Sequence, residues 1–288
     1  MTGRAPTVWA FRMGTNRAGL IAGVCLGLVF IGGRPACGAD DDIASAGLIA
    51  LGGAYSAIVD GALVWVNPAL PALSGQRGIA DFSYRRLYEL QELEEVACGV
   101  WQRLRSWGGL GLGFSRFGES GLYLETRAVI AASWAPRRNW AVGGGWEVRR
   151  IEYGEGERRY GGSDLTLAAA ARPISSVLAA AAWRRIQLEP LYDRDNQEPV
   201  VEVSASWSAP PDITLAGIWT AQAGDDQFGL GQRLHLASGI EFLSGLTFDP
   251  IRYSLGGRIT YAGGTIDYAY QSHSDLGGTH VIGFGWRW

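Results

Sequence analysis

Several residue types that would support a metal site, a disulfide framework or nucleic-acid binding are scarce in this chain. Its 288 residues include only three cysteines, three histidines and no lysine, so all 25 cationic residues are arginines. A net charge of −3 gives no electrostatic support for nucleic-acid binding. His235, His273 and His280 have neither the spacing of metal ligands nor that of a catalytic triad. We therefore expect no catalytic residue, no metal and no cofactor.

The first 39 residues follow the order of a secretory signal peptide. Arginines precede an apolar stretch over 18–33, and small residues follow it before a run of aspartates. The apolar stretch is shorter than the roughly 20 residues that a membrane-spanning helix needs. We expect cleavage after Ala39, which removes four arginines and lowers the net charge to about −7. Cys98 then has no partner in its own chain, which excludes a disulfide framework.

Beyond residue 75 the apolar residues alternate with polar or small ones, which is typical of strands between two different environments. In 251–261, for example, Tyr253, Leu255 and Ile259 share one face, and arginines, serine, glycine and threonine occupy the other. Many of these segments have ten or more residues, which suits tilted membrane strands. Fourteen segments follow this pattern, near 78–88, 95–103, 107–117, 121–135, 139–153, 162–172, 176–189, 199–209, 212–223, 226–237, 239–248, 251–261, 265–271 and 281–288.

The connections between these segments alternate in length, as in bacterial barrels with short periplasmic turns and longer outer loops. A soluble β-sandwich also alternates, but its outward face would be polar. The sequence therefore predicts an all-β, transmembrane, antiparallel up-and-down barrel over 78–288, with about 14 strands and 12 as the alternative. We expect it in the outer membrane of a Gram-negative-type bacterium, with both barrel termini periplasmic. Short turns are expected at 136–139, 173–175, 210–212, 237–239 and 262–264, and longer links at 153–163, 189–199, 224–227 and 272–279.

Aromatic residues support the membrane interpretation in two ways. Tryptophans beside the expected turns indicate an aromatic girdle at the two bilayer interfaces. The chain ends on the apolar face of its last segment, where Phe284, Trp286 and Trp288 resemble the assembly signal of bacterial outer-membrane proteins. This resemblance implies outer-membrane lipid and the barrel-assembly machinery as partners. The girdle residues are Trp134, Trp140, Trp207, Trp286 and Trp288.

The segment between the signal peptide and the barrel is apolar and less regular. Gly52 and Gly53 precede a short run from Ala54 and Tyr55 to Asp60 that could form two helical turns, and the triplet 67–69 forms a turn. Such a segment would occlude a barrel that is too wide for its own side chains to fill. The alternative is a small strand or core formed by residues 63–66. The triplet consists of Asn67, Pro68 and Ala69.

These motifs resemble the N-terminal plug of the FadL-like long-chain fatty-acid transporters and of the PorV/PorQ family. The stretches 249–254, 267–270 and 275–280 also resemble the last three strands of PorV-like members, so the two resemblances together cover residues 46–75 and 249–288. A departure is 70–73, where the family more often has a glycine soon after Asn-Pro-Ala. The resemblance implies a plug over residues 40–77 and a barrel that admits small hydrophobic compounds.

Charged residues of both signs occupy the inner face, which indicates cross-strand salt bridges. We expect these salt bridges to stiffen the lumen, and we favour this interpretation over a charged permeation path. The function classes left open are a plugged channel that admits or binds a hydrophobic small molecule, a non-transporting scaffold or shuttle for a secreted protein, and a structural barrel. The inner-face residues expected from the alternation are Glu125, Arg127, Glu147, Arg149, Glu202, Arg233, Arg252, Arg258 and Asp267.

Overall fold

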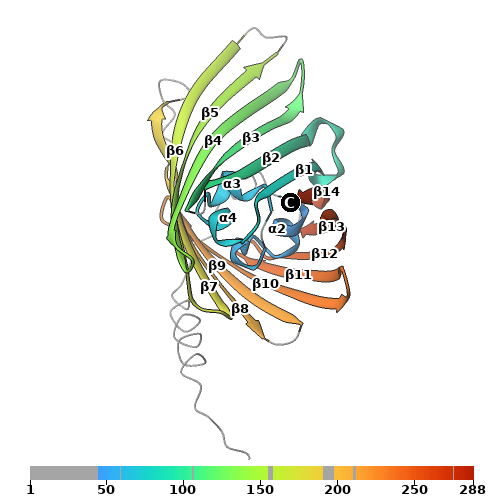
Figure 1. Ribbon diagram of the computed structural model, residues 1–288. Helices are drawn as coiled ribbons and strands as arrows, with labels where there is room; N and C mark the ends of the chain where they lie inside the picture. The colour runs from blue at the N-terminus through green and yellow to red at the C-terminus, as the bar shows by residue number, and fades with distance from the viewer. Residues whose placement is uncertain are drawn as a thin grey trace, which may run out of the picture. The chain divides into compact units, whose positions relative to one another are not determined.

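The computed structural model describes residues 45–58, 60–105, 107–154, 158–190, 198–209, 212–274 and 276–288. These residues form a closed barrel of 14 antiparallel strands, in which each strand pairs with its sequence neighbours and β1 pairs with β14 (Figure 1). The predicted fold class and the count of fourteen strands are therefore confirmed, and the alternative of twelve is wrong. The expected signal peptide lies outside the described residues.

The strands are close to the segments predicted from the alternation of residues. The longest ones, β4 to β6, also begin and end within a few residues of their predicted bounds, apart from the start of β6. The strands are β1 Gly78–Arg86, β2 Glu94–Arg105, β3 Gly108–Glu119, β4 Tyr123–Arg137, β5 Trp140–Tyr153, β6 Arg158–Ile174, β7 Val177–Glu189, β8 Val200–Ala209, β9 Ile213–Gln222, β10 Asp225–Ala237, β11 Ile240–Phe248, β12 Arg252–Tyr261, β13 Gly264–His273 and β14 Gly277–Arg287.

The outer face of the barrel is apolar and the inner face is polar or small, as a lipid-embedded barrel requires. On β12, Tyr253 and Leu255 are 63% and 53% exposed, whereas Arg252 and Arg258 are 7% and 2% exposed. Because successive side chains of a strand point to opposite faces, the buried arginines lie inside and the exposed apolar residues outside. Among the described residues, no helix is long and apolar enough to cross a membrane.

The turns at the end of the barrel that contains Trp288 are short, as predicted, and connect β4 to β5, β6 to β7, β10 to β11 and β12 to β13. At the opposite end the connections are more varied than expected. The link predicted at 224–227 is instead a tight turn, in which Ala223 and Gly224 have φ angles of 58° and 83°. A two-residue turn in which both residues have positive φ matches the twist of the flanking strands. The strands β9 and β10 are therefore connected without a longer loop.

The girdle tryptophans lie at one end of the barrel and not at both. Trp134, Trp207, Trp286 and Trp288 are between 41% and 52% exposed, and the ring of Trp140 contacts that of Trp134 at 5.8 Å between centroids. All five lie beside short turns or the chain terminus, so the expectation of a girdle at the second interface is wrong for these residues. They mark the depth of a single membrane interface.

The described residues of 45–75, namely 45–58 and 60–75, precede the first strand and lie inside the ring of strands, and we call them the inner segment (Figure 1). The expected two helical turns after Gly53 are a single 3₁₀ turn, η1, and residues 63–66 form a helix instead of a strand. The elements of the inner segment are α2 Ala46–Ala50, η1 Tyr55–Ala57, α3 Leu63–Val66 and α4 Leu70–Leu73. Two further 3₁₀ turns follow the last residue of β1 and connect β1 to β2. They are η2 Leu87–Glu89 and η3 Gln91–Leu93.

Trp288 closes the barrel at the seam between the first and last strands. Its carbonyl oxygen accepts hydrogen bonds from the backbone amides of Arg77 and Gly78 at 2.8 and 3.0 Å, and its own amide donates to the Gly78 carbonyl. The indole Nε1 donates to Oε1 of Gln102 on β2 at 3.1 Å. The last residue therefore joins three strands at the end of the barrel where the chain terminates.

Candidate functional site

The inner segment begins with a helix whose two ends are set by its sequence. The Ser45 hydroxyl accepts a hydrogen bond from the Leu48 amide and caps the N-terminus of α2. Gly52 and Gly53 follow the helix with φ angles of 61° and 82°, a conformation that strains residues with a Cβ atom. The Gly53 amide donates to the Leu48 carbonyl, which ends the helix in the manner of a glycine C-cap.

The inner segment is packed against glycines on the inner face of the wall. A Cβ atom on Gly245 would lie 2.3 Å from the Gly52 nitrogen, and one on Gly143 would lie 2.7 Å from the Ala69 nitrogen. Only glycine leaves room for a backbone at such distances. The wall glycines at which an added Cβ atom would lie less than 3.0 Å from the inner segment are Gly99, Gly111, Gly113, Gly143, Gly229, Gly231, Gly245 and Gly256. The abundance of glycine in the chain is thus partly explained by this contact.

Polar contacts join the middle of the inner segment to β7 and β8. The Ser56 and Ser204 hydroxyl oxygens are 2.7 Å apart, and the Ser206 hydroxyl donates to the Ser56 carbonyl at 2.9 Å. Asn67 is fully buried, donates to the Ala181 carbonyl at 3.1 Å and accepts from the Ala69 amide. The side chain of Asn67 therefore both shapes the turn before α4 and fixes it to the wall.

On the other side of the lumen, the inner segment contacts a buried ion pair. Arg258 donates to both oxygens of Asp267 at 2.7 and 2.6 Å, and Asp60 lies 3.9 Å from the same guanidinium. The Ser45 hydroxyl donates to Asp60 at 2.6 Å. Burial raises the pKa of the Asp60 carboxyl, while Arg258 and Ser45 act in the opposite direction. These contacts link the start of the inner segment to β12 and β13.

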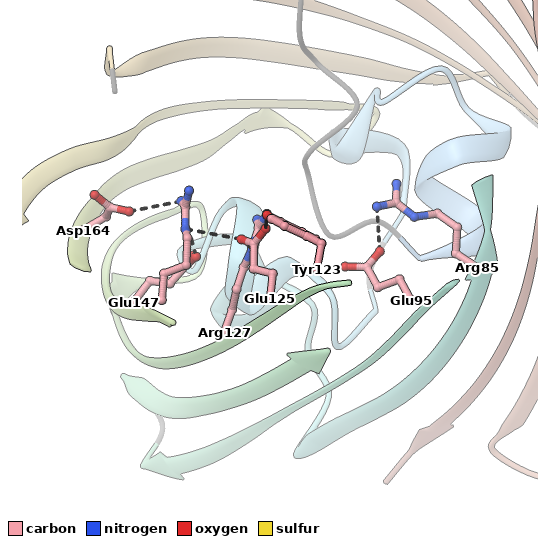
Figure 2. Close-up of polar contacts among 8 residues, drawn as sticks. Arg85, Glu95, Tyr123, Glu125, Arg127, Glu147 and Asp164 are labelled. Carbon is pink, nitrogen blue, oxygen red and sulfur yellow. Dashed lines mark hydrogen bonds and ion pairs between the residues drawn. The ribbon is translucent and has the colours of Figure 1, made fainter. Parts of the chain in front are cut away.

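A second polar cluster covers the inner face of β4, β5 and β6 (Figure 2). The Arg127 guanidinium donates to Glu125 at 2.5 Å. Arg149 lies 3.5 Å from Glu125, 3.8 Å from Glu147 and 3.2 Å from Asp164. The cluster surrounds a cavity of about 20 Å³ that also borders Trp65 of α3, which is room for about one water molecule. Because opposite charges face each other here, the cluster is suited to stiffening the wall.

The remaining inner-face residues that the sequence singled out lie elsewhere in the barrel. Glu202 accepts two hydrogen bonds from Arg184 at 2.9 and 2.7 Å, joining β7 to β8. Arg233 donates to the Thr214 hydroxyl at 3.3 Å, and Arg252 is buried on β12. The nine residues therefore occupy the inner face in separate groups and do not converge on one site.

Aromatic rings line the inside of the barrel at the end opposite Trp288. Phe117, Tyr123, Tyr153 and Tyr160, which we call the mouth cluster, lie on four consecutive strands with centroids 6.0, 5.3 and 6.0 Å apart in edge-to-face contacts. Alternation along each strand places these rings on the same face as the β4–β6 polar cluster, and the Tyr123 hydroxyl donates to Glu125 at 2.7 Å. The mouth cluster therefore lies next to the β4–β6 polar cluster, on the side farther from Trp288.

Sequence reasoning missed several residues that face the lumen. Arg85 and Glu95 form a 2.6 Å ion pair between β1 and β2, shown apart from the β4–β6 cluster in Figure 2. Their alternation was visible in the sequence, but the register that sets them opposite each other was not. Asp60 and Ser56 gave no signal at all, because their partners are far away in the sequence and no periodicity connects an irregular segment to a strand.

The comparison with solved structures supports the fold. No protein-family model and no curated protein matches the sequence, so the predicted PorV-like membership stays a prediction. The structure is similar to the TodX ΔS2S3 mutant monoaromatic hydrocarbon channel, with a TM-score of 0.67 and 9% identity over 86% of this chain and 100% of that one.

Two more solved structures show the same likeness. The CymD monoaromatic hydrocarbon channel has a TM-score of 0.67 and 10% identity, covering 85% of this chain and 97% of its own. The Pseudomonas putida toluene transporter TodX has a TM-score of 0.62 and 9% identity, covering 86% of this chain and 99% of its own. At such identities the likeness establishes a shared β-barrel fold and no more.

Proposed function

We propose that this protein is an outer-membrane channel for small hydrophobic compounds and that the inner segment closes it at rest. The observation that carries the proposal is the burial of the inner segment, whose apolar residues Leu51, Leu63 and Leu70 are at most 1% exposed although they precede the first strand. A barrel of fourteen strands has a lumen that its own side chains do not fill, so a segment held inside it controls passage.

Two further observations support small hydrophobic cargo. The mouth cluster offers half-buried aromatic rings to a compound that arrives from the end opposite the chain terminus. The similar barrels TodX and CymD are described as monoaromatic hydrocarbon channels. The resemblance of the inner segment to the plug of FadL-like transporters points in the same direction. Passage then requires the inner segment to move away from part of the wall.

A disulfide between the inner segment and the wall tests this movement. Ser56 and Ser204 have hydroxyl oxygens 2.7 Å apart, so Ser56→Cys with Ser204→Cys brings two thiols close enough to be joined by an oxidant. Cys98→Ser in the same chain removes the native thiol of the barrel. We expect oxidation to lower the uptake of a small aromatic probe into reconstituted vesicles at least ten-fold, and reduction to restore it.

The single variants Ser56→Cys and Ser204→Cys, treated with the same oxidant, are the matched controls and should transport normally. Uptake that is equally fast with the disulfide closed would show that the segment does not gate the lumen. Deletion of residues 45–75 gives an independent measurement, since it should raise conductance if the segment is the barrier.

A second candidate is a non-transporting scaffold for a secreted protein. It is favoured by the contacts that hold the inner segment on two sides of the lumen, Ser56 to β8 and Asp60 to Arg258 of β12, because a segment fixed twice resists displacement. If the disulfide variant shows no uptake in either redox state and the purified barrel is recovered with an exported protein, the scaffold is the better description.

A further inference from the structure

A hollow with a volume of about 900 Å³ lies among the apolar side chains on the outer face of the barrel. Its floor is formed by the small residues Ala132 and Gly144, which pair with each other across β4 and β5. Leu110 of β3 pairs with Ala132, and Leu167 of β6 pairs with Gly144, so larger side chains border the floor on both sides. We call this hollow the outer groove.

Two tryptophans and an arginine border the outer groove at the end of the barrel that contains the short turns. Trp107 and Trp134 are both 47% exposed, and the backbone of Trp107 is hydrogen-bonded to that of Ala135. The Arg105 guanidinium lies over the Trp107 ring at 5.9 Å from the centroid. Indole rings of this kind sit at the level of lipid headgroups, so the groove runs from the headgroup level into the apolar part of the membrane.

The charge around this end of the outer groove has a single sign. The stretches 103–110, 132–144 and 165–177, which contain the ends of β2 to β6 and their turns, have five arginines and no acidic residue, although the whole chain is acidic. Arg105, Arg137 and Arg138 are exposed there, and the Arg172 amide donates to the Asn139 carbonyl, which brings the β6–β7 turn beside the β4–β5 turn. This arrangement attracts an anion at the membrane surface.

We propose that the outer groove binds an anionic phospholipid, with an acyl chain along Ala132 and Gly144 and the phosphate beside Arg105 and the arginines of the β4–β5 turn. An apolar groove alone would accept any hydrocarbon, but its position beside the three exposed arginines Arg105, Arg137 and Arg138 selects a molecule with an apolar chain and a negative headgroup. A groove of this size lies within the range of ligand sites in proteins. The site is separate from the lumen and does not depend on the proposed channel.

Lipid retention by the full mature barrel tests the proposal. The barrel is reconstituted with equal amounts of phosphatidylglycerol and phosphatidylcholine with identical chains, extracted in mild detergent and analysed by native mass spectrometry. We expect phosphatidylglycerol to be retained preferentially. Replacement of Arg105 by glutamine should weaken this retention about five-fold, and the combined replacement of Arg105, Arg137 and Arg138 should weaken it more, since each arginine near a charged membrane surface contributes about 1 kcal/mol.

Variants that fill the groove separate its shape from its charge. Gly144→Leu should abolish retention of the lipid, whereas Gly257→Leu, on the outer face of β12, should leave it unchanged. Arg116→Gln, at the opposite end of β3, is the matched control for charge. The folded state of each variant is checked by its shift in electrophoretic mobility on heating, and Arg105→Gln is used alone if Gly144→Leu does not fold.

Three results would overturn the proposal. The first is equal retention of the two phospholipids by the wild-type barrel. The second is a Gly144→Leu barrel that retains phosphatidylglycerol as well as the wild type does. The third is a groove occupied by a second copy of the chain, seen as a dimer that Gly144→Leu dissociates and that carries no lipid.

Discussion

Gly256 of β12 faces Ala50 of α2 so closely that a Cβ atom on Gly256 would lie 2.6 Å from the Ala50 Cβ atom. The next residue, Gly257, points to the outer face, where the nearest atom to an added Cβ would be 3.9 Å away. Two adjacent glycines of one strand therefore differ in what they contact. Gly256 leaves room for the inner segment, and Gly257 does not contact it.

The Gly256→Ala variant should loosen the inner segment. We expect the free energy of unfolding to fall by about 1–3 kcal/mol, the usual cost of adding a methyl group to a packed interior, and the inner segment to become accessible to protease. The Gly257→Ala variant is the matched control and should change the free energy of unfolding by less than about 0.5 kcal/mol. Urea titration of the refolded barrel measures both. Equal effects would mean that β12 itself, and not the contact with Ala50, is sensitive to a methyl group.

The Asp267→Asn variant should destabilise the barrel by about 3 kcal/mol or more, because Arg258 is 2% exposed and would lose its negative partner and one of the two acceptor oxygens. The temperature at which the folded band converts on electrophoresis should fall accordingly. The Asp212→Asn variant, in an exposed turn, controls for the loss of an acid. A double replacement, Arg258→Met with Asp267→Leu, should be less harmful than the single one. If the double replacement is as harmful as the single one, the ion pair contributes more to the stability of the barrel than the attraction between its two charges.

The Tyr153→Ala variant should lower the uptake of a small aromatic probe, because Tyr153 is the ring shared by two edge-to-face contacts of the mouth cluster. A loss of about three- to ten-fold corresponds to one aromatic contact of typical strength. The Tyr153→Phe variant keeps the ring and should transport normally. The Tyr261→Ala variant removes a tyrosine that is 85% exposed on the outer face, and it should also be neutral. Vesicle uptake rates at low probe concentration measure the effect.

The Trp288→Ala variant should assemble less efficiently than the wild type but still close. Alanine keeps the backbone hydrogen bonds to Arg77 and Gly78, whereas the bond from the indole to Gln102 is lost. Deletion of Trp288 removes both kinds of contact and should reduce the folded fraction further. The fraction of heat-modifiable protein after insertion into membranes distinguishes the two. If alanine substitution and deletion are equally harmful, the ring and not the backbone closes the seam.

Much of the barrel could be predicted because a strand between lipid and lumen must alternate, and alternation is a local property of the sequence. The segment that became β12 shows this directly, since its exposed Leu255 and buried Arg258 follow the predicted faces. The tight turn at Ala223 and Gly224 was missed because polar residues on both sides of it have the composition of a longer loop. Turn geometry depends on two backbone angles that composition does not report.

The inner polar residues show the limit of such reasoning. Alternation indicated that Glu125 and Arg149 face inward, but it could not indicate that Arg149 contacts acids on two neighbouring strands. The partners of a charged side chain depend on the register between strands. Register is set by the closure of the whole sheet, and a shift of two residues would preserve every face while changing every pair.

The sequence by itself determined which faces of the strands meet lipid and lumen, and where the chain ends on an aromatic residue, because these follow from the order of neighbouring residues. Only the tertiary structure decided that residues 45–75 lie against inner-wall glycines, that Asp60 lies near Arg258, and that Trp288 joins Arg77 and Gly78. These contacts join residues that are far apart in the chain. They form only when the closed barrel brings its two ends and its interior together.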